Sequence, residues 1–303
     1  MEESPSSCLD PQLRRASFLD RPVGDCLGFP ELLSAAQGEH QDVGLRFYVE
    51  VLGLEHLHYG LWTKSDPLTL EGLRAAQERY LDHLLTQLPA APGSVLDVGC
   101  GAGGNSKVLM ERGYEVEGLS PDPFHGERFR EATGRPFHLA KFQDFRAERR
   151  FDIVFMSESA QYVPLDRLFD SVATAVEPGG CLLLSDYFVL VKDGTPVTKS
   201  GHLLDDFLAA ATNAGFRLDY EEDITEQVLP SLALGGQILD ELILPGMRLV
   251  LLRLSQKRPR LVRFVLRRLR SRLAKLEKRK EILDPDLYRR KKRYMIYRFQ
   301  APS

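Results

Sequence analysis

Between residues 93 and 223, short apolar runs alternate with amphipathic segments. The runs have the length of β-strands, and the segments between them carry apolar residues at helical spacing. The predicted strands are Ser94–Val98, Glu115–Leu119, Pro136–Ala140, Phe151–Met156, Cys181–Tyr187 and Phe216–Glu221. The predicted helices are Asn105–Arg112, Phe124–Thr133, Leu165–Val176 and Leu203–Ala214. This alternation is typical of an α/β fold in which helices cover both faces of a parallel sheet.

The chain outside this region predicts additions to the sheet. Residues 42–92 have a helical pattern, in which Gly72–Leu88 is amphipathic and ends at Pro89. Arg293–Phe299 alternates like a seventh strand that follows a long insertion. The expected parts are a loose N-terminal arm (1–41), a helical cap (42–92), a core (93–234), a helical insertion or lid (235–290) and the last core strand (291–303).

Composition is that of an ordinary globular protein, with 43% hydrophobic and 27% charged residues. No run approaches the roughly 18–20 apolar residues of a membrane span, and the polar, acidic start does not resemble a signal peptide. The cysteines and histidines show no metal-ligand spacing. We therefore expect a cytoplasmic protein without disulfides and without a metal site.

Charge is distributed unevenly along the chain. Residues 253–298 contain 19 Lys/Arg and 4 Asp/Glu, which leaves 21 basic and 39 acidic residues elsewhere. Within this segment, residues 259–280 form an amphipathic pattern with apolar residues at helical spacing and Arg or Lys between them. Such a helix either docks on the acidic body of the chain or meets an anionic membrane surface. Nucleic acid is an unlikely partner, because no binding module or interleaved aromatic pattern accompanies the charge.

A glycine-rich turn follows the first predicted strand and precedes a helix. In Val95–Gly104, Asp97 is followed by Gly99, Gly101 and Gly103, where the chain must turn sharply or lie against a ligand. Gly99, Gly101 and Gly104 also have the spacing of a dinucleotide site, so spacing alone does not exclude NAD. Asp97 favours S-adenosylmethionine instead, because its negative charge repels a pyrophosphate but suits a cationic amino and sulfonium group.

The run Val-Leu-Asp-Val-Gly-Cys-Gly-Ala-Gly resembles the first motif of class I S-adenosylmethionine-dependent methyltransferases. The resemblance covers about residues 93–223 and includes Phe151–Val154 and Glu177–Gly180, which match the fourth-strand motif and the turn before the fifth strand. It implies a Rossmann-like, seven-stranded, doubly wound sheet with S-adenosylmethionine as the cofactor.

Two further segments are cofactor contacts by this resemblance. Family members usually end the second strand in an acid that binds the ribose, whereas this chain has Ser120, with Asp122 two residues later. Either side chain is a candidate for that contact, or the segment is a simple turn. Phe142, Gln143 and Asp144 lie where the family places its adenine contacts. Phe142 is equally compatible with a place in the core.

Acceptor residues are expected beyond the carboxyl ends of the fourth and fifth strands. Glu158 and Tyr162 resemble the post-strand-four motif of sarcosine/tocopherol methyltransferases and cyclopropane-fatty-acid-synthase-like enzymes, although the histidine that many relatives carry nearby is absent. His202 is a candidate base or a helix cap, and the cap is favoured. The segment Leu57–Trp62 resembles a cap that folds over the cofactor, with Tyr59 or His58 at the methionine end, or it is a surface turn with a buried tryptophan.

These residues predict a small-molecule methyltransferase, of the kind found in secondary metabolism, that transfers a methyl group to O, N or C of a moderately apolar acceptor. The catalytic candidates are His202, Glu158 and Tyr162. One alternative is a lipid- or membrane-directed enzyme of the cyclopropane-synthase type. The other is a non-catalytic S-adenosylmethionine- or RNA-binding protein. The sequence leaves the acceptor and the oligomeric state open.

Overall fold

The computed structural model describes residues 51–54, 56–260, 262–264, 266–268 and 280–303. The chain divides into two units, 1–55 and 56–303, and the second unit holds the elements discussed below. The predicted N-terminal arm and the first residues of the predicted cap lie outside the described residues.

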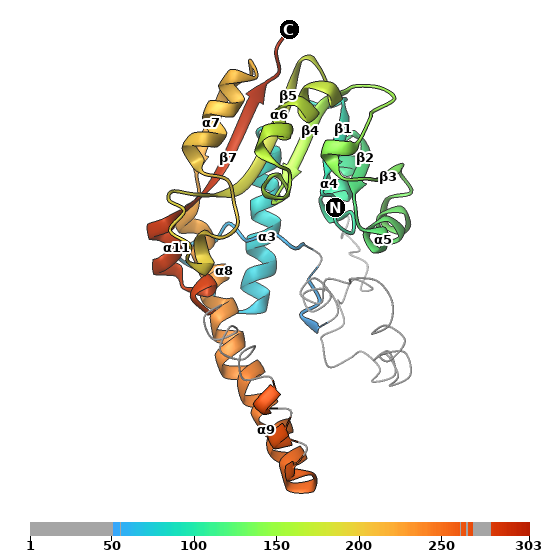
Figure 1. The fold of residues 1–303 in the computed structure, drawn as a ribbon. Coiled ribbons are helices and arrows are strands. Elements are labelled where there is room, and N and C mark those ends of the chain that lie inside the picture. Colours follow the sequence, from blue (N-terminus) through green and yellow to red (C-terminus); the bar gives the residue numbers. More distant parts are fainter. Residues whose placement is uncertain (1–50, 55, 261, 265, 269–279) are drawn as a thin grey trace, which may run out of the picture. The chain divides into compact units, whose positions relative to one another are not determined.

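A seven-stranded sheet with the order β3-β2-β1-β4-β5-β7-β6 forms the centre of the second unit (Figure 1). Its strands are β1 (Ser94–Val98), β2 (Glu115–Ser120), β3 (Phe137–Leu139), β4 (Phe151–Ser157), β5 (Val176–Val189), β6 (Arg217–Asp223) and β7 (Lys292–Gln300). Strands β1 to β5 pair in parallel, and β7 lies antiparallel between β5 and β6. The predicted α/β fold with seven strands and a last strand reached after an insertion is confirmed.

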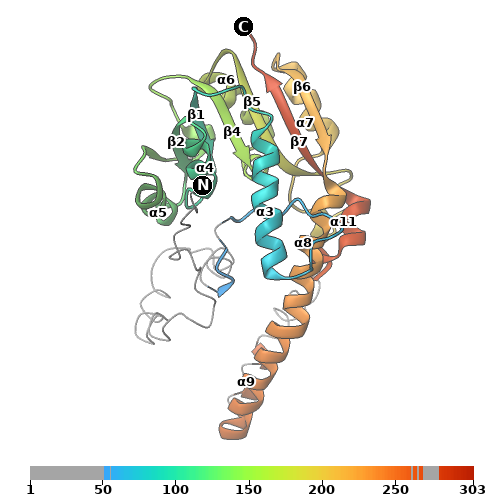
Figure 2. The same ribbon diagram turned by 180° about the vertical axis from the view of Figure 1, so that it is seen from behind.

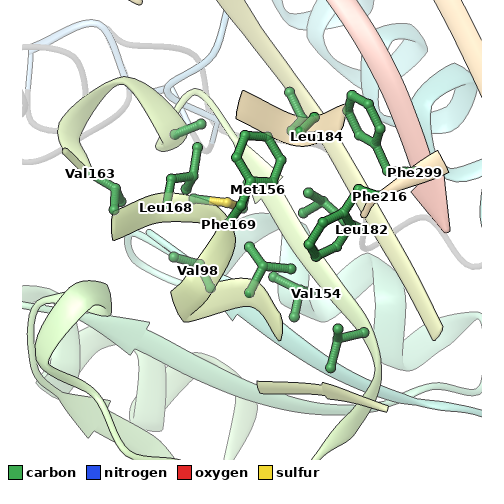
Figure 3. Packing of buried hydrophobic residues seen from close by; sticks show 14 of the residues in the cluster. Val98, Val154, Met156, Val163, Leu168, Phe169, Leu182, Leu184, Phe216 and Phe299 are labelled. Atoms are coloured by element: carbon green, nitrogen blue, oxygen red, sulfur yellow. The ribbon is translucent and has the colours of Figure 1, made fainter. Parts of the chain in front are cut away.

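Alternate residues of the central strands pack into different layers. Leu96, Val154 and Leu182 belong to one core cluster, whereas Val95 and Ile153 belong to another. Figure 3 shows the first cluster, where Phe169 of a covering helix meets sheet residues such as Met156 and Leu184. Because side chains alternate across a strand, continuous apolar runs place apolar residues on both faces, and both faces need helices.

Those helices fall into two layers. Helices α6 (Leu165–Ala175) and α7 (Leu204–Asn213) contribute to the first cluster. Helices α3 (Leu70–Leu85), α4 (Gly104–Glu111), α8 (Thr225–Gln237) and α11 (Pro285–Lys291) contribute to the second, and α3 lies in front of the sheet in Figure 2. Helix α5 (Pro123–Thr133) packs against the β2–β3 edge through Phe129 and Phe137.

Short helical turns complete the connections. They are η4 (Phe142–Asp144), η5 (Ala160–Tyr162), η6 (Pro196–Thr198) and η8 (Lys280–Leu283). Most element boundaries agree with the prediction within a few residues. The exception is β5, which begins at Val176 because Val176 pairs with Phe151 before a register shift, so the expected turn is part of the strand.

The insertion before β7 contains more helix than the amphipathic pattern at 259–280 predicted. Helix α8 continues through the π-helical turn η7 (Ile238–Ile243) into α9 (Leu244–Lys257), and Figure 1 shows α8 and α9 in line. An ion pair of 2.5 Å between Lys280 and Asp240 brings the end of the insertion back beside η7. The predicted helix 259–280 is helical wherever the structure describes it, up to Arg268. Among the described residues, no helix has the length and apolar character to cross a membrane.

Candidate functional site

The glycine-rich turn lies between β1 and α4, and its three predicted glycines all have positive φ angles. These are 79° at Gly99, 54° at Gly101 and 90° at Gly103. A Cβ at Gly99 would overlap the side chain of Ser159, and one at Gly103 would come within 3.2 Å of Phe129 and Thr133. Among the described residues, a Cβ at Gly101 would meet only Leu57, at 3.8 Å. Packing within the protein therefore requires glycine at two of these positions, and Gly101 is the one with open space beside it.

Asp97 lies at the carboxyl end of β1 with only 2% of its surface exposed. Its carboxylate accepts a 2.6 Å hydrogen bond from the Ser106 hydroxyl of α4. Burial raises the pKa of Asp97 to about 7. The hydrogen bond from Ser106 has the opposite, smaller effect and lowers it. A buried carboxylate with one neutral donor is poorly compensated, so the position suits a cationic ligand group.

At the end of β2, the side chains of Ser120 and Asp122 make local hydrogen bonds. Ser120 is buried, and its Oγ lies 3.4 Å from His125 Nδ1 and accepts from the Asp122 backbone at 3.3 Å. Asp122 is the N-cap of α5 and accepts from the Phe124 backbone N–H at 2.9 Å. The turn thus orders both side chains beside the glycine-rich loop, and capping already occupies one oxygen of Asp122.

The three predicted adenine contacts lie in η4 and differ in exposure. Phe142 is buried in the first core cluster, Gln143 is half-buried and Asp144 is exposed. Phe142 therefore takes the core position that the sequence left as its alternative, and Gln143 and Asp144 are the members of the trio with accessible side chains.

Glu158 connects three separate parts of the chain. It follows β4 with a φ of 54°, a left-handed conformation that is uncommon for a residue other than glycine. Its Oε1 accepts hydrogen bonds from the Tyr59 backbone N–H at 2.7 Å and from the Tyr294 hydroxyl of β7 at 2.6 Å. Burial raises its pKa to about 7, so both protonation states of the carboxyl group are populated near neutral pH.

Asp186 and Lys292 add a second acid and a cation beside Glu158. Asp186 accepts hydrogen bonds from the backbone N–H groups of Gln161 at 3.1 Å and Tyr187 at 2.8 Å. Its pKa is raised to about 7 by burial and by the charge of Glu158. Lys292 Nζ lies 3.7 Å from the ring centroid of Tyr187. Sequence reasoning missed Lys292, because it is one of five consecutive Arg/Lys residues that read as a solvated basic run.

Several buried tyrosines surround these charged groups. Tyr294 Oη lies 3.2 Å from Tyr80 Oη, and Tyr80 Oη lies 3.2 Å from Ser157 Oγ. The pKa values of Tyr80 and Tyr294 are raised by burial and by the charge of Glu158. These phenols therefore stay protonated and act as hydrogen-bond donors and acceptors. The only advance signal for Tyr294 was its place in the alternating pattern of the last strand.

The structure gives His202 and Tyr162 different environments. The N-cap of α7 is Leu203, so the favoured role of His202 as a helix cap is wrong. Leu203 forms a bridge with Val189 at the end of β5, and His202 Nε2 lies 3.0 Å from the Ala160 carbonyl. That contact makes Nε2 a donor and leaves Nδ1 as the basic atom of a neutral ring. Tyr162 is 77% exposed, at the surface of η5.

The segment from His58 to Trp62 is fixed by hydrogen bonds to two helices. Ser231 of α8 accepts from the Gly60 backbone at 3.0 Å and from Trp62 Nε1 at 2.8 Å. Gln77 of α3 donates to the His58 carbonyl at 2.6 Å. His58 is buried, its pKa is lowered to about 3 by burial and by His56, and Nε2 has no hydrogen-bond partner among the described residues. This segment brings the Tyr59 backbone to Glu158.

A family profile described as a methyltransferase domain matches residues 73–223. The chain is 36% identical over 148 residues to 2-methyl-6-phytyl-1,4-hydroquinone methyltransferase of Synechocystis, covering 44% of this chain and 45% of that protein. It is 28% identical over 163 residues to tocopherol O-methyltransferase, chloroplastic, of Arabidopsis thaliana, covering 46% and 47%. The chain thus spans less than half the length of these curated relatives.

Solved structures share the fold at low sequence identity. Geranyl diphosphate C-methyltransferase from Streptomyces coelicolor, crystallised with S-adenosyl-L-homocysteine, superposes with a TM-score of 0.62 at 15% identity, covering 88% of this chain and 95% of that one. The cyclase SpnF superposes with a TM-score of 0.63 at 17% identity, covering 86% and 95%. Because a cyclase and a methyltransferase both have this fold, the fold by itself does not decide the reaction.

Proposed function

Because the chain belongs to the class I S-adenosylmethionine-dependent methyltransferases, we propose that it transfers a methyl group from S-adenosylmethionine to an oxygen or carbon atom of a small, moderately apolar acceptor. The observation that carries the proposal is the buried Asp97 beside the glycine-rich turn, within the matched family region. The named relatives, which methylate a phytyl hydroquinone and tocopherol, support an acceptor of this chemical class.

The cofactor would lie along the turn at Gly101, with Asp97 facing its cationic end. Ser120 and Asp122 would contact the ribose, and Gln143 and Asp144 would contact the adenine. A structural test of this fit is that Gly101 has open space where Gly99 and Gly103 have none. The buried carboxyl of Asp97 is also the type of group that a sulfonium or ammonium compensates.

When bound, the cofactor supplies the reactive methyl carbon, and the protein supplies alignment and proton handling. Glu158 is the proposed proton acceptor for a hydroxyl acceptor, because its pKa of about 7 lets it both take and release a proton near neutral pH. Tyr294 and the Tyr59 backbone hold its Oε1 and so fix the direction of Oε2. His202 remains a second candidate base through Nδ1, whereas the exposed Tyr162 is proposed to line the entrance for the acceptor.

Calorimetry with S-adenosylmethionine tests the cofactor site. We expect Asp97→Ala and Gly101→Val to reduce binding below detection, because the first removes the counter-charge and the second fills the open space beside the turn. Gly194→Val is the matched control, since Gly194 also has a positive φ of 77° but, in the part of the chain that the structure describes, has no neighbour within 4 Å of an added Cβ. Wild-type affinity in Asp97→Ala would refute the site, and labelled-methyl transfer to metabolite extracts then tests turnover.

The insertion 235–290 is proposed as a lid, with an anionic membrane surface as its candidate partner. Residues 242–268 contain eight Lys/Arg and no Asp/Glu. Large apolar side chains are exposed on the same segment, including Leu242 at 66%, Leu249 at 65% and Val250 at 60%. Exposed apolar surface next to cations is typical of helices that lie on anionic bilayers. A cytoplasmic location stays a prediction from the cysteine usage.

Vesicle co-sedimentation tests this contact. The full chain is expected to pellet with vesicles of phosphatidylcholine and phosphatidylglycerol but not with phosphatidylcholine alone. The double variant Arg263→Glu with Arg267→Glu is expected to stay in the supernatant. Arg146→Glu with Lys199→Glu carries the same charge change at exposed positions elsewhere and is expected to pellet. If the wild-type chain stays in solution with both kinds of vesicle, the membrane proposal is wrong.

A further inference from the structure

Lys292 is the first residue of β7 and lies at the carboxyl edge of the parallel strands. Because β7 runs antiparallel to β5, its start pairs with the end of β5, with Lys292 opposite Val189 and Tyr294 opposite Tyr187. Side chains two residues apart share one face of a strand, and directly opposed residues share it too. Lys292, Tyr294 and Tyr187 therefore lie on the same face, next to Glu158, which Tyr294 contacts.

The side chain of Lys292 is buried, and the protein compensates the charge of its ammonium group only weakly. The residue is 4% exposed, and its Nζ lies 3.7 Å from the ring centroid of Tyr187 and 5.7 Å from that of Tyr288. Among the described residues, no carboxylate oxygen lies within the 4.0 Å of an ion pair with Nζ, although Asp186 and Glu158 are near enough to act on its charge. The Lys292 ammonium has three N–H donors, and the face of the Tyr187 ring accepts one of them, so two donors are left for other partners.

The neighbouring acids already have donors of their own. Both oxygens of Asp186 accept backbone N–H groups, and Oε1 of Glu158 accepts two hydrogen bonds. Lys292 is thus a buried cation with spare donors beside a carboxyl group that is the proposed proton acceptor. Its ammonium group keeps unused donors and some accessible surface, so a ligand oxygen can reach it and complete its hydrogen bonds.

We propose that Lys292 donates a hydrogen bond to the acceptor oxygen that is methylated, and that the acceptor is an acidic hydroxyl compound such as a phenol, hydroquinone or enol. This rests on the proposed methyl transfer and specifies its acceptor. The hydroxyl proton passes to the Glu158 carboxylate, the O–C bond forms as the methyl C–S bond breaks, and the sulfur keeps the electron pair. The Lys292 ammonium stabilises the negative charge that develops on the oxygen.

The charges around Lys292 favour this acceptor class over a phosphate or a carboxylate. Two carboxyl groups lie near one ammonium, so a permanently charged anion would meet repulsion from both acids. An oxygen that becomes negative only while Glu158 takes its proton meets less repulsion, because the transfer neutralises one of the acids. The rings of Tyr187, Tyr288 and Tyr294 supply an aromatic surrounding that suits such an acceptor.

The test uses two chromophoric probes that differ by one methyl group, 4-nitrophenol and 4-nitroanisole, with the full-length protein. The absorbance of bound 4-nitrophenol reports its ionisation. We expect 4-nitrophenol to bind to wild-type protein with its proton transferred to Glu158, so that the bound probe absorbs as the ionised phenol at a pH where the free probe is still protonated. Lys292→Met should weaken binding of the ionised phenol by about 10- to 100-fold, as for a charge-assisted hydrogen bond. Its affinity for 4-nitroanisole should stay within about twofold of wild type.

Lys292→Arg distinguishes a binding role from a structural one. The pKa of Lys292 is lowered to about 8 by burial, so binding of the ionised phenol to wild type should fall as the pH rises above 8. Arginine keeps its charge, so Lys292→Arg should remove the part of the decline above pH 8 and leave the part that follows ionisation of Glu158 and Asp186 near pH 7. The proposal is wrong if wild type binds both probes equally or not at all, or if Lys292→Met leaves the preference intact. Calorimetry with S-adenosylmethionine is run on each variant, and its failure would instead count against the methyltransferase proposal.

Discussion

Replacing Gly99 by alanine tests whether the glycine-rich turn is determined by packing within the protein. Gly99 has a φ of 79°, and an added Cβ would overlap Ser159 Cβ. The left-handed conformation costs an L-residue about 1–2 kcal/mol, and forcing a methyl group into a packed site costs about 1–3 kcal/mol. Gly99→Ala should therefore lower the free energy of unfolding by about 2–5 kcal/mol, or Tm by roughly 4–15 °C.

Two further variants separate the contributions. Gly194 has a φ of 77° and no described residue within 4 Å of an added Cβ, so Gly194→Ala should show only the conformational cost of about 1–2 kcal/mol. Ser159→Gly removes the overlapping Cβ but also the 2.5 Å hydrogen bond from Ser159 Oγ to the Val98 carbonyl, which costs about 1 kcal/mol. In the double variant the overlap disappears, so its loss should be smaller than the sum of the single losses by about 1–3 kcal/mol.

Urea unfolding followed by circular dichroism measures all four variants. If Gly99→Ala and Ser159→Gly are additive within about 0.5 kcal/mol, the two sites do not interact and the packing explanation is refuted. The packing explanation is also refuted if Gly99→Ala lowers the free energy of unfolding no more than Gly194→Ala does. Either result would leave the two reasons that the sequence offered for Gly99, a sharp turn of the backbone or a ligand lying against it.

Two other predictions concern pH and the cap. The folded-state pKa values of Asp97, Glu158 and Asp186 are raised to about 7, so the native state binds more protons than the unfolded chain between about pH 4 and 7. The contribution of these three groups to the stability of the free protein should be greatest below that window and fall as the pH rises through it. Asp186→Asn should therefore make the free energy of unfolding in urea fall less steeply with pH than in wild type, and an unchanged difference across the window would contradict this. Ser231→Ala removes the hydrogen-bond acceptor of Trp62, the chain's single tryptophan. The variant should lower the free energy of unfolding by about 1–3 kcal/mol and alter the fluorescence emission of Trp62. Unchanged emission and an unchanged Tm would contradict the attachment of the segment His58–Trp62 to α8.

Local pattern was sufficient for the sheet and the cofactor turn. The central strands of the parallel core carry continuous apolar runs, such as Ile153–Met156 in β4 and Cys181–Leu184 in β5, because both of their faces are buried, and that property is visible in any short window of sequence. The run from Val95 to Gly104 combines a strand, an acid, glycines and a helix start within ten residues, so its meaning does not depend on distant parts of the chain. For the same reason, the helix that begins near Leu165 was located to within a residue of its observed bounds.

Contacts between distant residues were decided only by the tertiary structure. Glu158 meets Tyr59 and Tyr294 across 99 and 136 positions of the chain, and no local pattern specifies such a meeting. His202 was misread as a helix cap because the bridge between Leu203 and Val189 displaces the helix start by one residue.

At single positions, too, the sequence decided one property and the tertiary structure another. The sequence identified Gly99 and Gly101 together as one motif, but only the packing of Ser159 distinguishes the glycine required by the protein from the one with open space beside it. Lys292 lies in a basic run that reads as solvent-exposed, yet its pairing opposite Val189 at the start of β7 buries it over Tyr187. Sequence therefore determines the elements and the cofactor loop, because these depend on neighbours along the chain. The acceptor side depends on strand register, which brings together residues that no sequence window contains.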